Sequence, residues 1–193
     1  LPIFVYTTKY REGSDMFSRA ASTLEKEKKD AGCSVLCVGI IHKKELVEIF
    51  QQIRNQGNEI DEYHFIGHSG MYGPMFGTRD YPEQFSPYEI TQLKIPFGPK
   101  ARAYFHCCRS GRWFASFFAK EFNIETFGFF WYTSFSSDKK YYKAVKRSTD
   151  PVYAIGCKGK KSHGWIGAVK KHFRLEPLEA MKSFQPDSFA VDR

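Results

Sequence analysis

The chain has 193 residues, of which 42% are hydrophobic and 17% are aromatic, and its formal net charge is +8 at pH 7. The aromatic content argues against disorder, and no apolar run reaches the roughly 20 residues of a membrane span, so we expect one globular domain and no membrane span. Lysines are spread along most of the chain rather than gathered in one block, so we do not expect nucleic acid to be the main partner.

The first half of the chain alternates short apolar runs with amphipathic ones. Residues 3–6 favour a strand, and Ser14-Asp15 could cap a helix that ends near Gly32. Residues 34–41 form a nearly unbroken apolar run, which is typical of a central strand covered on both faces. The spacing of Leu46, Ile49, Phe50 and Ile53 predicts a second helix before Gly57, so the pattern is β-α-β-α.

The second half continues this alternation. We expect strands at residues 63–66, 102–107, 126–133 and 152–156, a short helix from 86 to 93, and a helix that begins at Arg112. The glycines and prolines of residues 69–87 suit a hairpin or excursion at the edge of the sheet. Residues 134–150 read as an exposed lysine-rich loop, and the tail favours helices at 166–173 and 178–184.

Two of the apolar runs end in side chains that can carry chemistry. Tyr63-His-Phe-Ile-Gly-His-Ser-Gly70 delivers His68, and Ala103-Tyr-Phe-His-Cys-Cys-Arg-Ser-Gly111 delivers Cys107 and Cys108. Because the carboxyl ends of parallel strands meet at one edge of a sheet, we expect the imidazole and a thiol to lie close together. A nearby histidine can accept the proton of a cysteine, which attacks as the thiolate, and the amides at a helix N-terminus stabilise that anion.

These motifs resemble those of the caspase-like cysteine peptidases of clan CD, above all the bacterial CHAT branch. That family carries a His-Gly pair after one strand and a cysteine after the next, within Gln-Ala-Cys-Arg-Gly or Ser-Ala-Cys-x-Thr-Gly. Residues 106–111, His-Cys-Cys-Arg-Ser-Gly, match the second pattern with Ser for Thr and keep the Cys-Arg pair of the first. The likeness extends from about residue 63 to residue 131 and departs at Ser69, where the family has glycine.

The resemblance implies a three-layer α/β/α sandwich with a mostly parallel sheet of about six strands, and the activity of a cysteine endopeptidase. It makes Cys108 the nucleophile and His68 the residue that serves the proton transfers, and it leaves Cys107 as a packed strand residue. The oxyanion hole would use the amides of Cys108 and of Ser69 or Gly70. The resemblance further implies that His106 and Trp131 line the substrate pocket.

Protein or peptide substrates, and a regulatory protein domain, are the partners that this resemblance suggests, and we expect no cofactor and no metal. Five cysteines, an odd number, fit reduced thiols and a cytoplasmic location. The first six residues lack the features of a signal peptide, and the chain does not begin with Met, which fits a domain excised from a longer protein.

Other interpretations stay open. Gly67-His-Ser-Gly-Met71 nearly spells the Gly-x-Ser-x-Gly elbow of serine α/β-hydrolases, with Ser69 as nucleophile and Asp150 and His163 or His172 as partners. The same fold could also be a catalytically inactive interaction module. A zinc site made of His106, Cys107, Cys108, Cys157 and His163 is the least favoured, because it has no Cys-x-x-Cys pair.

Overall fold

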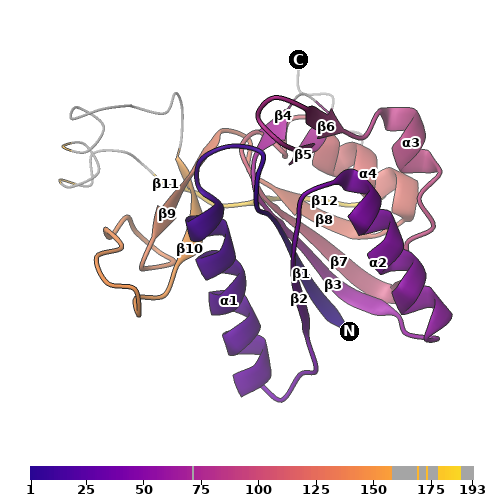
Figure 1. Cartoon of the computed structure of the whole chain (residues 1–193), viewed down its shortest axis with the longest axis horizontal. Helices are drawn as coiled ribbons and strands as arrows, with labels where there is room; N and C mark the ends of the chain where they lie inside the picture. The colour runs from indigo at the N-terminus through magenta and orange to yellow at the C-terminus, as the bar shows by residue number, and fades with distance from the viewer. Residues whose placement is uncertain (71, 158–168, 170–172, 174–177, 188–193) are drawn as a thin grey trace.

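A six-stranded, mostly parallel sheet forms the centre of the molecule (Figure 1). The computed structural model describes residues 1–70, 72–157, 169, 173 and 178–187. Strand order is β12-β8-β7-β3-β1-β2, and only β12 runs antiparallel to its neighbour. The strands are β1 (Pro2–Thr7), β2 (Leu36–Ile40), β3 (Ile60–Ile66), β7 (Phe97–His106), β8 (Glu125–Gly128) and β12 (Lys182–Phe184).

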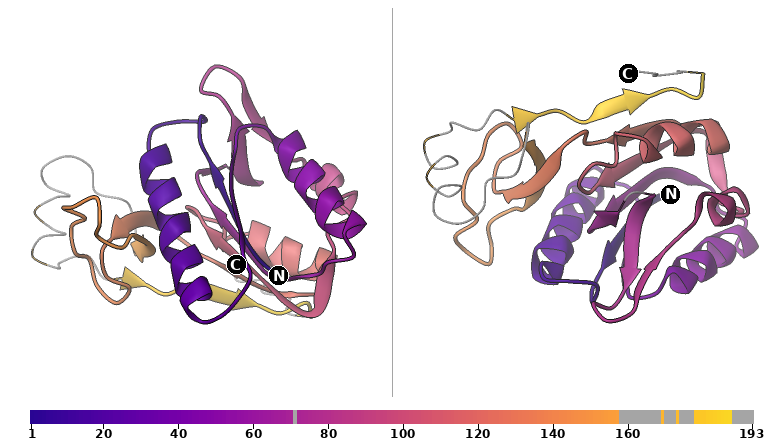
Figure 2. Two further views of the ribbon diagram at one scale, coloured as in Figure 1. Left: turned by 60° about the horizontal axis from the view of Figure 1, so that its bottom comes forward. Right: turned by 90° about the horizontal axis from the view of Figure 1, so that it is seen from above.

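Helices cover both faces of this sheet, which gives the α/β fold that the sequence predicts (Figure 2). One face is covered by α1 (Ser14–Asp30), and the other by α2 (Lys43–Asn55), α3 (Pro87–Thr91) and α4 (Phe114–Phe122). α3 begins with the expected Ser86-Pro87 cap, and Ser86 accepts a hydrogen bond from the Glu89 amide. No helix among the described residues is long and apolar enough to cross a membrane.

Two small antiparallel sheets extend from the carboxyl edge of the central one. The first contains β4 (Ser69–Gly70), β5 (Gly73–Gly77) and β6 (Pro82–Gln84), so residues 69–87 form the expected excursion. The second contains β9 (Tyr132–Ser136), β10 (Tyr153–Cys157) and β11 (Leu178–Glu179). These two additions bring segments that are distant in sequence to the ends of β3 and β7.

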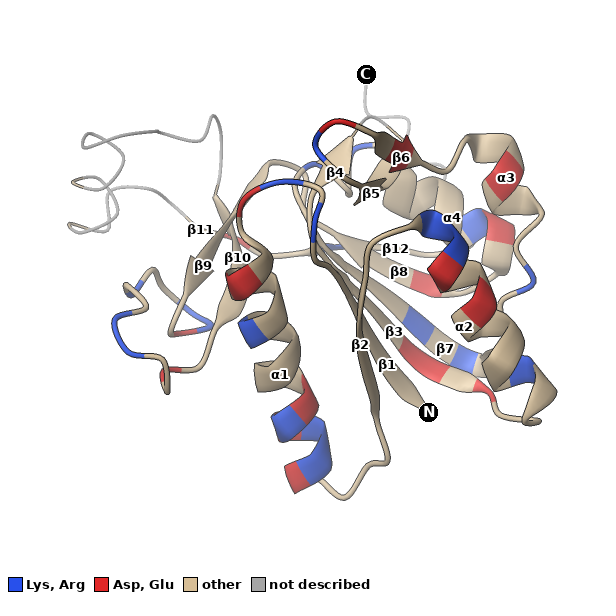
Figure 3. Ribbon diagram, viewed as in Figure 1, with Lys and Arg blue, Asp and Glu red and all other residues tan. Residues whose placement is uncertain are grey.

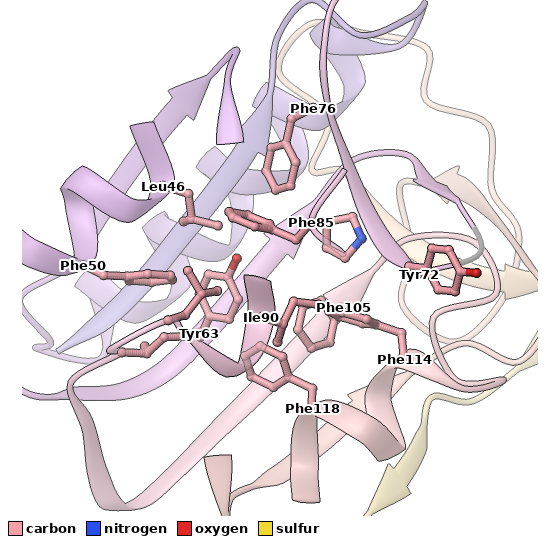
Figure 4. A pocket seen from close by; sticks show the side chains of 13 residues that line it. Leu46, Phe50, Tyr63, Tyr72, Phe76, Phe85, Ile90, Phe105, Phe114 and Phe118 are labelled. Carbon is pink, nitrogen blue, oxygen red and sulfur yellow. The ribbon is translucent and has the colours of Figure 1, made fainter. Parts of the chain in front are cut away.

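The larger part of the core lies between the sheet and α2, α3 and α4. Phe105 of β7 is 1% exposed, and its ring centre lies 4.7 Å from Phe114, 5.0 Å from Phe118 and 5.8 Å from Tyr63. These rings border an apolar cavity of about 20 Å³, which Figure 4 shows between the β-sheet and the helices. Such a lining offers a water molecule few partners, so the fold is held here by packing.

β2 lies at the edge of the sheet, so the expectation of a central strand for residues 34–41 was wrong. The strand is apolar on both faces because α1 contacts it from one side and α2 from the other. Coverage of two faces by helices produces the same sequence pattern in an edge strand as in a central one. The pattern therefore reports burial of the faces and not the number of strand neighbours.

Three further expectations in the second half were wrong. Residues 126–133 do not form one strand, because the chain leaves the central sheet after Gly128 and β9 begins at Tyr132. β10 joins β9 and not the central sheet, whose sixth strand is β12. Residues 178–184 form β11 and β12 and not a helix, since Phe184 is buried with Ala115 and Ala119 as β12 pairs with β8. The helix expected at 166–173 lies largely outside the described residues.

The lysine-rich loop between β9 and β10, blue in much of its course in Figure 3, is anchored to α1. Arg19 donates from Nη2 to the carbonyl oxygens of Arg147 and Asp150, at 2.6 and 3.2 Å. Lys139 Nζ lies 2.7 Å from Glu27 Oε2, and the Val152 amide donates to Thr23 Oγ1 at 3.0 Å. One helix therefore positions the hairpin that carries β9.

Phe105→Ala should lower the free energy of unfolding by about 3–5 kcal/mol, because it removes a buried ring and enlarges a cavity that is already present. Urea unfolding followed by circular dichroism measures this change. Tyr88→Ala is the matched control, since Tyr88 is 74% exposed and its loss should cost no more than about 0.5 kcal/mol. Equal losses in the two variants would contradict this account of the core.

Candidate active site

The register of β3 and β7 brings the two sequence motifs together. Ile66 pairs with His106, so His68 and Cys108 each follow two residues beyond the last paired positions of adjacent parallel strands. The two turns are also in direct contact, because the Ser69 hydroxyl donates a short hydrogen bond to the Cys108 carbonyl oxygen. The expected meeting of a histidine turn and a cysteine turn at the carboxyl edge is therefore present in the structure.

Gly67 lets the chain turn between β3 and His68. A Cβ at this position would lie 2.6 Å from Thr7 Oγ1 and 3.0 Å from the Phe65 ring, so no side chain fits between β1 and β3 here. The chain then enters β4, where Ser69 pairs with Pro74 and Gly70 pairs with Gly73. The His68 carbonyl accepts from the Met75 amide at 3.0 Å, which ties the turn to β5.

The imidazole of His68 is held by the segment that precedes α1. Its Nε2 lies 2.8 Å from the carbonyl oxygen of Glu12. Because a carbonyl oxygen only accepts hydrogen bonds, Nε2 carries the proton and Nδ1 of the neutral ring carries the lone pair. Phe17 and Tyr10 meet the ring edge-on, with centroids 5.0 and 5.7 Å away. Nδ1 is therefore the nitrogen of His68 that can accept a proton.

The cysteine turn is built around the buried hydroxyl of Ser110, which is 1% exposed. Its oxygen lies 3.0 and 2.9 Å from the carbonyls of Phe105 and Cys107 and accepts from the Phe129 amide at 3.2 Å. The next residue, Gly111, approaches β8 so closely that a Cβ would lie 2.8 Å from the Gly128 carbonyl oxygen. The Ser-Gly pair thus packs the turn onto the end of β8.

The Cys108 thiol is half-buried and faces β9. Sγ lies 3.3 Å from Thr133 Oγ1 and accepts from the Thr133 amide, also at 3.3 Å. Thr133 itself is only 8% exposed. Two polar groups of one residue therefore contact the sulfur, while the Cys108 carbonyl is engaged by Ser69.

The start of α4 and the position of Cys107 can be compared with the expectations from the sequence. α4 begins at Phe114 and not at Arg112, because residues 108–113 form successive turns in which the Ala115 amide donates to the Ser110 carbonyl. Cys108 is therefore not placed directly at the helix N-terminus. Cys107 follows the last residue of β7 and is fully buried in the core, so it is packed as expected but lies just beyond the strand, and burial raises the pKa of its thiol to about 12.

The structure also places the two candidate pocket residues. Trp131 lies beside the cysteine turn: its carbonyl accepts from the Arg109 amide at 2.6 Å, and the Arg112 guanidinium lies 4.5 Å from its ring centre. His106 lines a cleft of about 390 Å³ that is also bordered by β10 and β11. Trp131 is not among the residues that line this cleft, although its amide donates at 3.0 Å to Glu179, which does line it.

His106 belongs to a polar cluster that the sequence did not predict. Its Nε2 lies 3.0 Å from Nδ1 of His64, a strand residue that is 7% exposed. Burial lowers the pKa of both histidines, to about 3 for His106, where the neighbouring His64 adds to the effect. Glu62 accepts from His64 and from Lys28, and these hydrogen bonds lower its pKa to about 2. Both imidazoles are neutral near pH 7.

The described residues do not show the geometry that a serine hydrolase with Ser69 as nucleophile requires. Ser69 lies in a short strand that leads into a hairpin, and not at a strand-to-helix elbow, and its hydroxyl is used on Cys108. The Asp150 carboxylate accepts from the amides of Lys146 and Arg147 in the loop that lies against α1. His163 and His172, the candidate histidines of that triad, lie outside the described residues, as does the histidine of the suggested zinc site. The described part of the chain has no cluster of three or more metal-ligating side chains.

Two contacts of the site come from residues that the motifs do not contain. Glu12 contributes a backbone carbonyl to His68, and Thr133 contributes an amide and a hydroxyl to Cys108. A backbone carbonyl leaves no mark on the residue type, and a threonine in a strand is ordinary. Only the fold reveals that these two positions touch the candidate catalytic groups.

Ser110→Ala should lower the free energy of unfolding by about 1–3 kcal/mol, because it leaves the buried Phe129 amide without its acceptor. Chemical unfolding measures the loss. Ser137→Ala is the control, since that serine lies in the loop and its hydroxyl makes only 3.4 Å contacts. A loss at Ser110 no larger than at Ser137 would contradict the role assigned to this hydroxyl.

The stability of the protein should fall in acid. In the unfolded chain both histidines titrate near pH 6.5, whereas burial lowers the pKa of both in the folded chain, to about 3 for His106. The unfolded state therefore binds more protons between pH 6.5 and about 3, so the free energy of unfolding falls as pH decreases through this window. The lowered pKa of Glu62 acts in the same direction below pH 4.5.

Urea midpoints at pH 7.0, 5.5 and 4.5 measure this dependence, and His106→Phe should make it shallower. Tyr88→Ala should retain the dependence of the wild type. An unchanged slope in His106→Phe would show that the proton uptake occurs elsewhere.

Comparisons with known proteins do not assign the chain to a family. No protein-family model matches it, and neither a curated protein nor a solved structure matches it. What these residues do must therefore follow from the geometry and chemistry of the two turns.

Proposed function

We propose that the protein is a cysteine endopeptidase in which Cys108 is the nucleophile and His68 is the base. The observation that carries the proposal is the contact between the two turns at the carboxyl edge of the sheet, with a half-buried thiol on one and an oriented imidazole on the other. The resemblance of residues 63–131 to caspase-like peptidases supports the same assignment.

The reaction would proceed by acyl transfer. His68 accepts the proton of the Cys108 thiol at Nδ1, and the thiolate attacks the carbonyl carbon of the scissile peptide bond. The amides of Cys108 and of Ser69 or Gly70 stabilise the resulting oxyanion. His68 then gives its proton to the leaving amine, and a water molecule that His68 deprotonates hydrolyses the thioester. The products are an amine and a carboxylic acid, and the enzyme regains its proton.

Residues around the two turns would position these groups. The Glu12 carbonyl keeps the His68 proton on Nε2, so Nδ1 is the nitrogen that carries the lone pair in the neutral ring. Thr133 contacts Sγ with two groups that can donate to a thiolate. The Ser69 hydroxyl links one turn to the other, which limits the distance between base and nucleophile.

The proposal extends to substrate and compartment. A peptidase of this type acts on proteins or peptides, and a regulatory protein domain could control its access to them. Reduced cysteines favour the cytoplasm, and all five cysteines are free thiols in the structure.

Cys108→Ala and His68→Ala should each lower kcat/KM for peptide hydrolysis by about 10⁴-fold or more, because each removes one half of a unit that acts together. Cys107→Ala is the matched control and should stay within about tenfold of the wild type, and Ser69→Ala, which keeps the backbone amide and loses the hydroxyl link, should lose less activity than Cys108→Ala or His68→Ala. A fluorogenic peptide library supplies the substrates. Loss of activity in Ser69→Ala with retention in Cys108→Ala would support a serine hydrolase.

Alkylation gives a second measurement that needs no substrate. Iodoacetamide at pH 6, followed by mass mapping, should label Cys108 before the exposed Cys33, while the buried Cys107 stays unlabelled. Burial raises the pKa of Cys37 and of Cys107 to about 12, so neither competes. If Cys33 reacts first and no peptide is cut, the protein is an inactive interaction module.

A further inference from the structure

A continuous chain of hydrogen-bonding groups crosses β3 and β7 on the face that α1 covers. Lys28 of α1 lies 2.7 Å from Glu62, Glu62 lies 3.2 Å from Nε2 of His64, and Nδ1 of His64 lies 3.0 Å from Nε2 of His106. His64 also lies between Tyr104, whose ring is stacked on it, and Phe4, whose ring is tilted by 30°, with both ring centres 4.5 Å away. The catalytic steps proposed for His68 and Cys108 do not use this chain.

The charge of Glu62 fixes the direction of every hydrogen bond in the chain. A carboxylate only accepts, so Nε2 of His64 must carry its proton and Nδ1 of the neutral ring must accept. His106 then donates from Nε2 to His64, which leaves the lone pair of the neutral His106 ring on Nδ1. The carboxylate on β3 thus determines which ring nitrogen carries the proton in both imidazoles, including that of His106 on β7.

His106 is the last residue of β7 and lies at the wall of the 390 Å³ cleft, two residues before Cys108. Among the residues that the structure describes, the charged side chains that border this cleft are Lys139, Lys140 and Glu179. Lys139 is paired with Glu27, and the Glu179 carboxylate accepts from the Trp131 amide at 3.0 Å. The described part of the cleft therefore combines an acceptor at His106 with a border of two lysines and one carboxylate.

We propose that the cleft binds a neutral carboxamide, with His106 Nδ1 accepting from its NH₂ group, and that Glu62 and His64 are positioning residues that hold His106 in this state. On the proposed function, on which this step rests, the carboxamide belongs to an Asn or Gln that precedes the scissile bond. Its NH₂ group donates to His106, and its oxygen can accept from a lysine at the border. Deamidation is not involved, because the group is bound and not transformed.

The alternatives to a carboxamide fit less well. A carboxylate would place its lone pairs against the lone pair of His106, and an ammonium group would lie beside Lys139 and Lys140. A purely apolar side chain would leave the His106 acceptor without a partner, which costs about 1–3 kcal/mol in a desolvated site. A carboxamide offers an NH₂ donor and a carbonyl acceptor on separate atoms without net charge, whereas a hydroxyl carries both on a single oxygen.

The proton positions can be measured without any substrate. Long-range ¹H–¹⁵N spectra of the ¹⁵N-labelled protein distinguish protonated from unprotonated ring nitrogens, and His64 and His106 should both show Nε2–H. Glu62→Gln should produce a second tautomer in both rings, because a carboxamide can donate or accept. Glu125→Gln is the matched control, since Glu125 lies on β8 in the same register row and pairs with Arg102 at 3.1 Å, not with a histidine.

His64→Phe provides a second variant that keeps a ring in the stack and breaks the chain. It should release His106, which then samples both tautomers. A wild-type His106 protonated at Nδ1, or spectra that Glu62→Gln and His64→Phe leave unchanged, would overturn the proposal.

Ligand preference is tested in Cys108→Ala, which excludes turnover. N-acetyl-asparagine methylamide should shift the His106 Nδ1 resonance, and N-acetyl-aspartate methylamide at the same concentration should not. In the active protein, peptides that differ only in the residue before the cut should be cleaved about tenfold faster with Asn or Gln than with Asp or Lys. His106→Leu and Glu62→Gln should each remove about tenfold of that preference, which is the value of one hydrogen bond.

The two proposals fail in different ways. If no peptide is cut but the asparagine amide shifts His106, the peptidase assignment fails and the carboxamide site stands. If peptides are cut with equal rates for Asn and Asp, and neither amide shifts His106, the carboxamide site fails and the peptidase stands.

Discussion

The parallel register between β3 and β7 is the constraint on which the candidate site depends. It aligns Ile66 with His106, and both strands end within two residues of the side chains that matter. A slip of one residue between the two strands would turn one of them over relative to the other, so His68 and Cys108 would no longer follow positions that face the same side. The rings of Tyr63, Phe105 and Phe118 oppose such a shift, because they interlock beneath the two strands.

Small residues then convert the two strand ends into turns. At Gly67, where the chain leaves β3, neighbouring atoms leave no room for a Cβ, and Gly111 packs against the backbone of Gly128. Ser110 contributes a hydroxyl that serves both the strand carbonyls behind it and the Phe129 amide beside it. The position of the thiol is thus set by backbone contacts of its neighbours and not by the cysteine itself.

The strands and helices of the α/β core can be identified from the sequence because burial of one face produces a regular spacing of apolar residues. The apolar run before Cys107 and the i, i+3, i+4 spacing around Phe50 are such patterns, and β7 and α2 lie where they predict. The edge position of β2 could not be found, since its two faces are covered like those of a central strand. Residues 178–184 were misassigned because pairing with β8 and burial of Phe184 outweigh a weak local helical pattern.

The two turns of the site were also predictable, since each motif is local and the topology brings strand ends together. Thr133 was not, because the chain leaves the central sheet at Gly128 and returns to Cys108 from β9. The histidine chain was not either: His64 and His106 are 42 residues apart in the sequence, and only the strand register makes them neighbours. Long-range pairings of this kind carry no periodicity that a sequence could reveal.

Phe17 of α1 contacts both sides of the site. Its ring lies 5.0 Å from His68 and 5.7 Å from Phe135, a residue of the strand that carries Thr133. One side chain that belongs to neither motif therefore packs against the imidazole and against the strand whose threonine contacts the thiol. The packing of α1 against the sheet is therefore shared by the turn that carries His68 and by the strand that contacts the Cys108 thiol, so a change in the position of this helix would be felt at both.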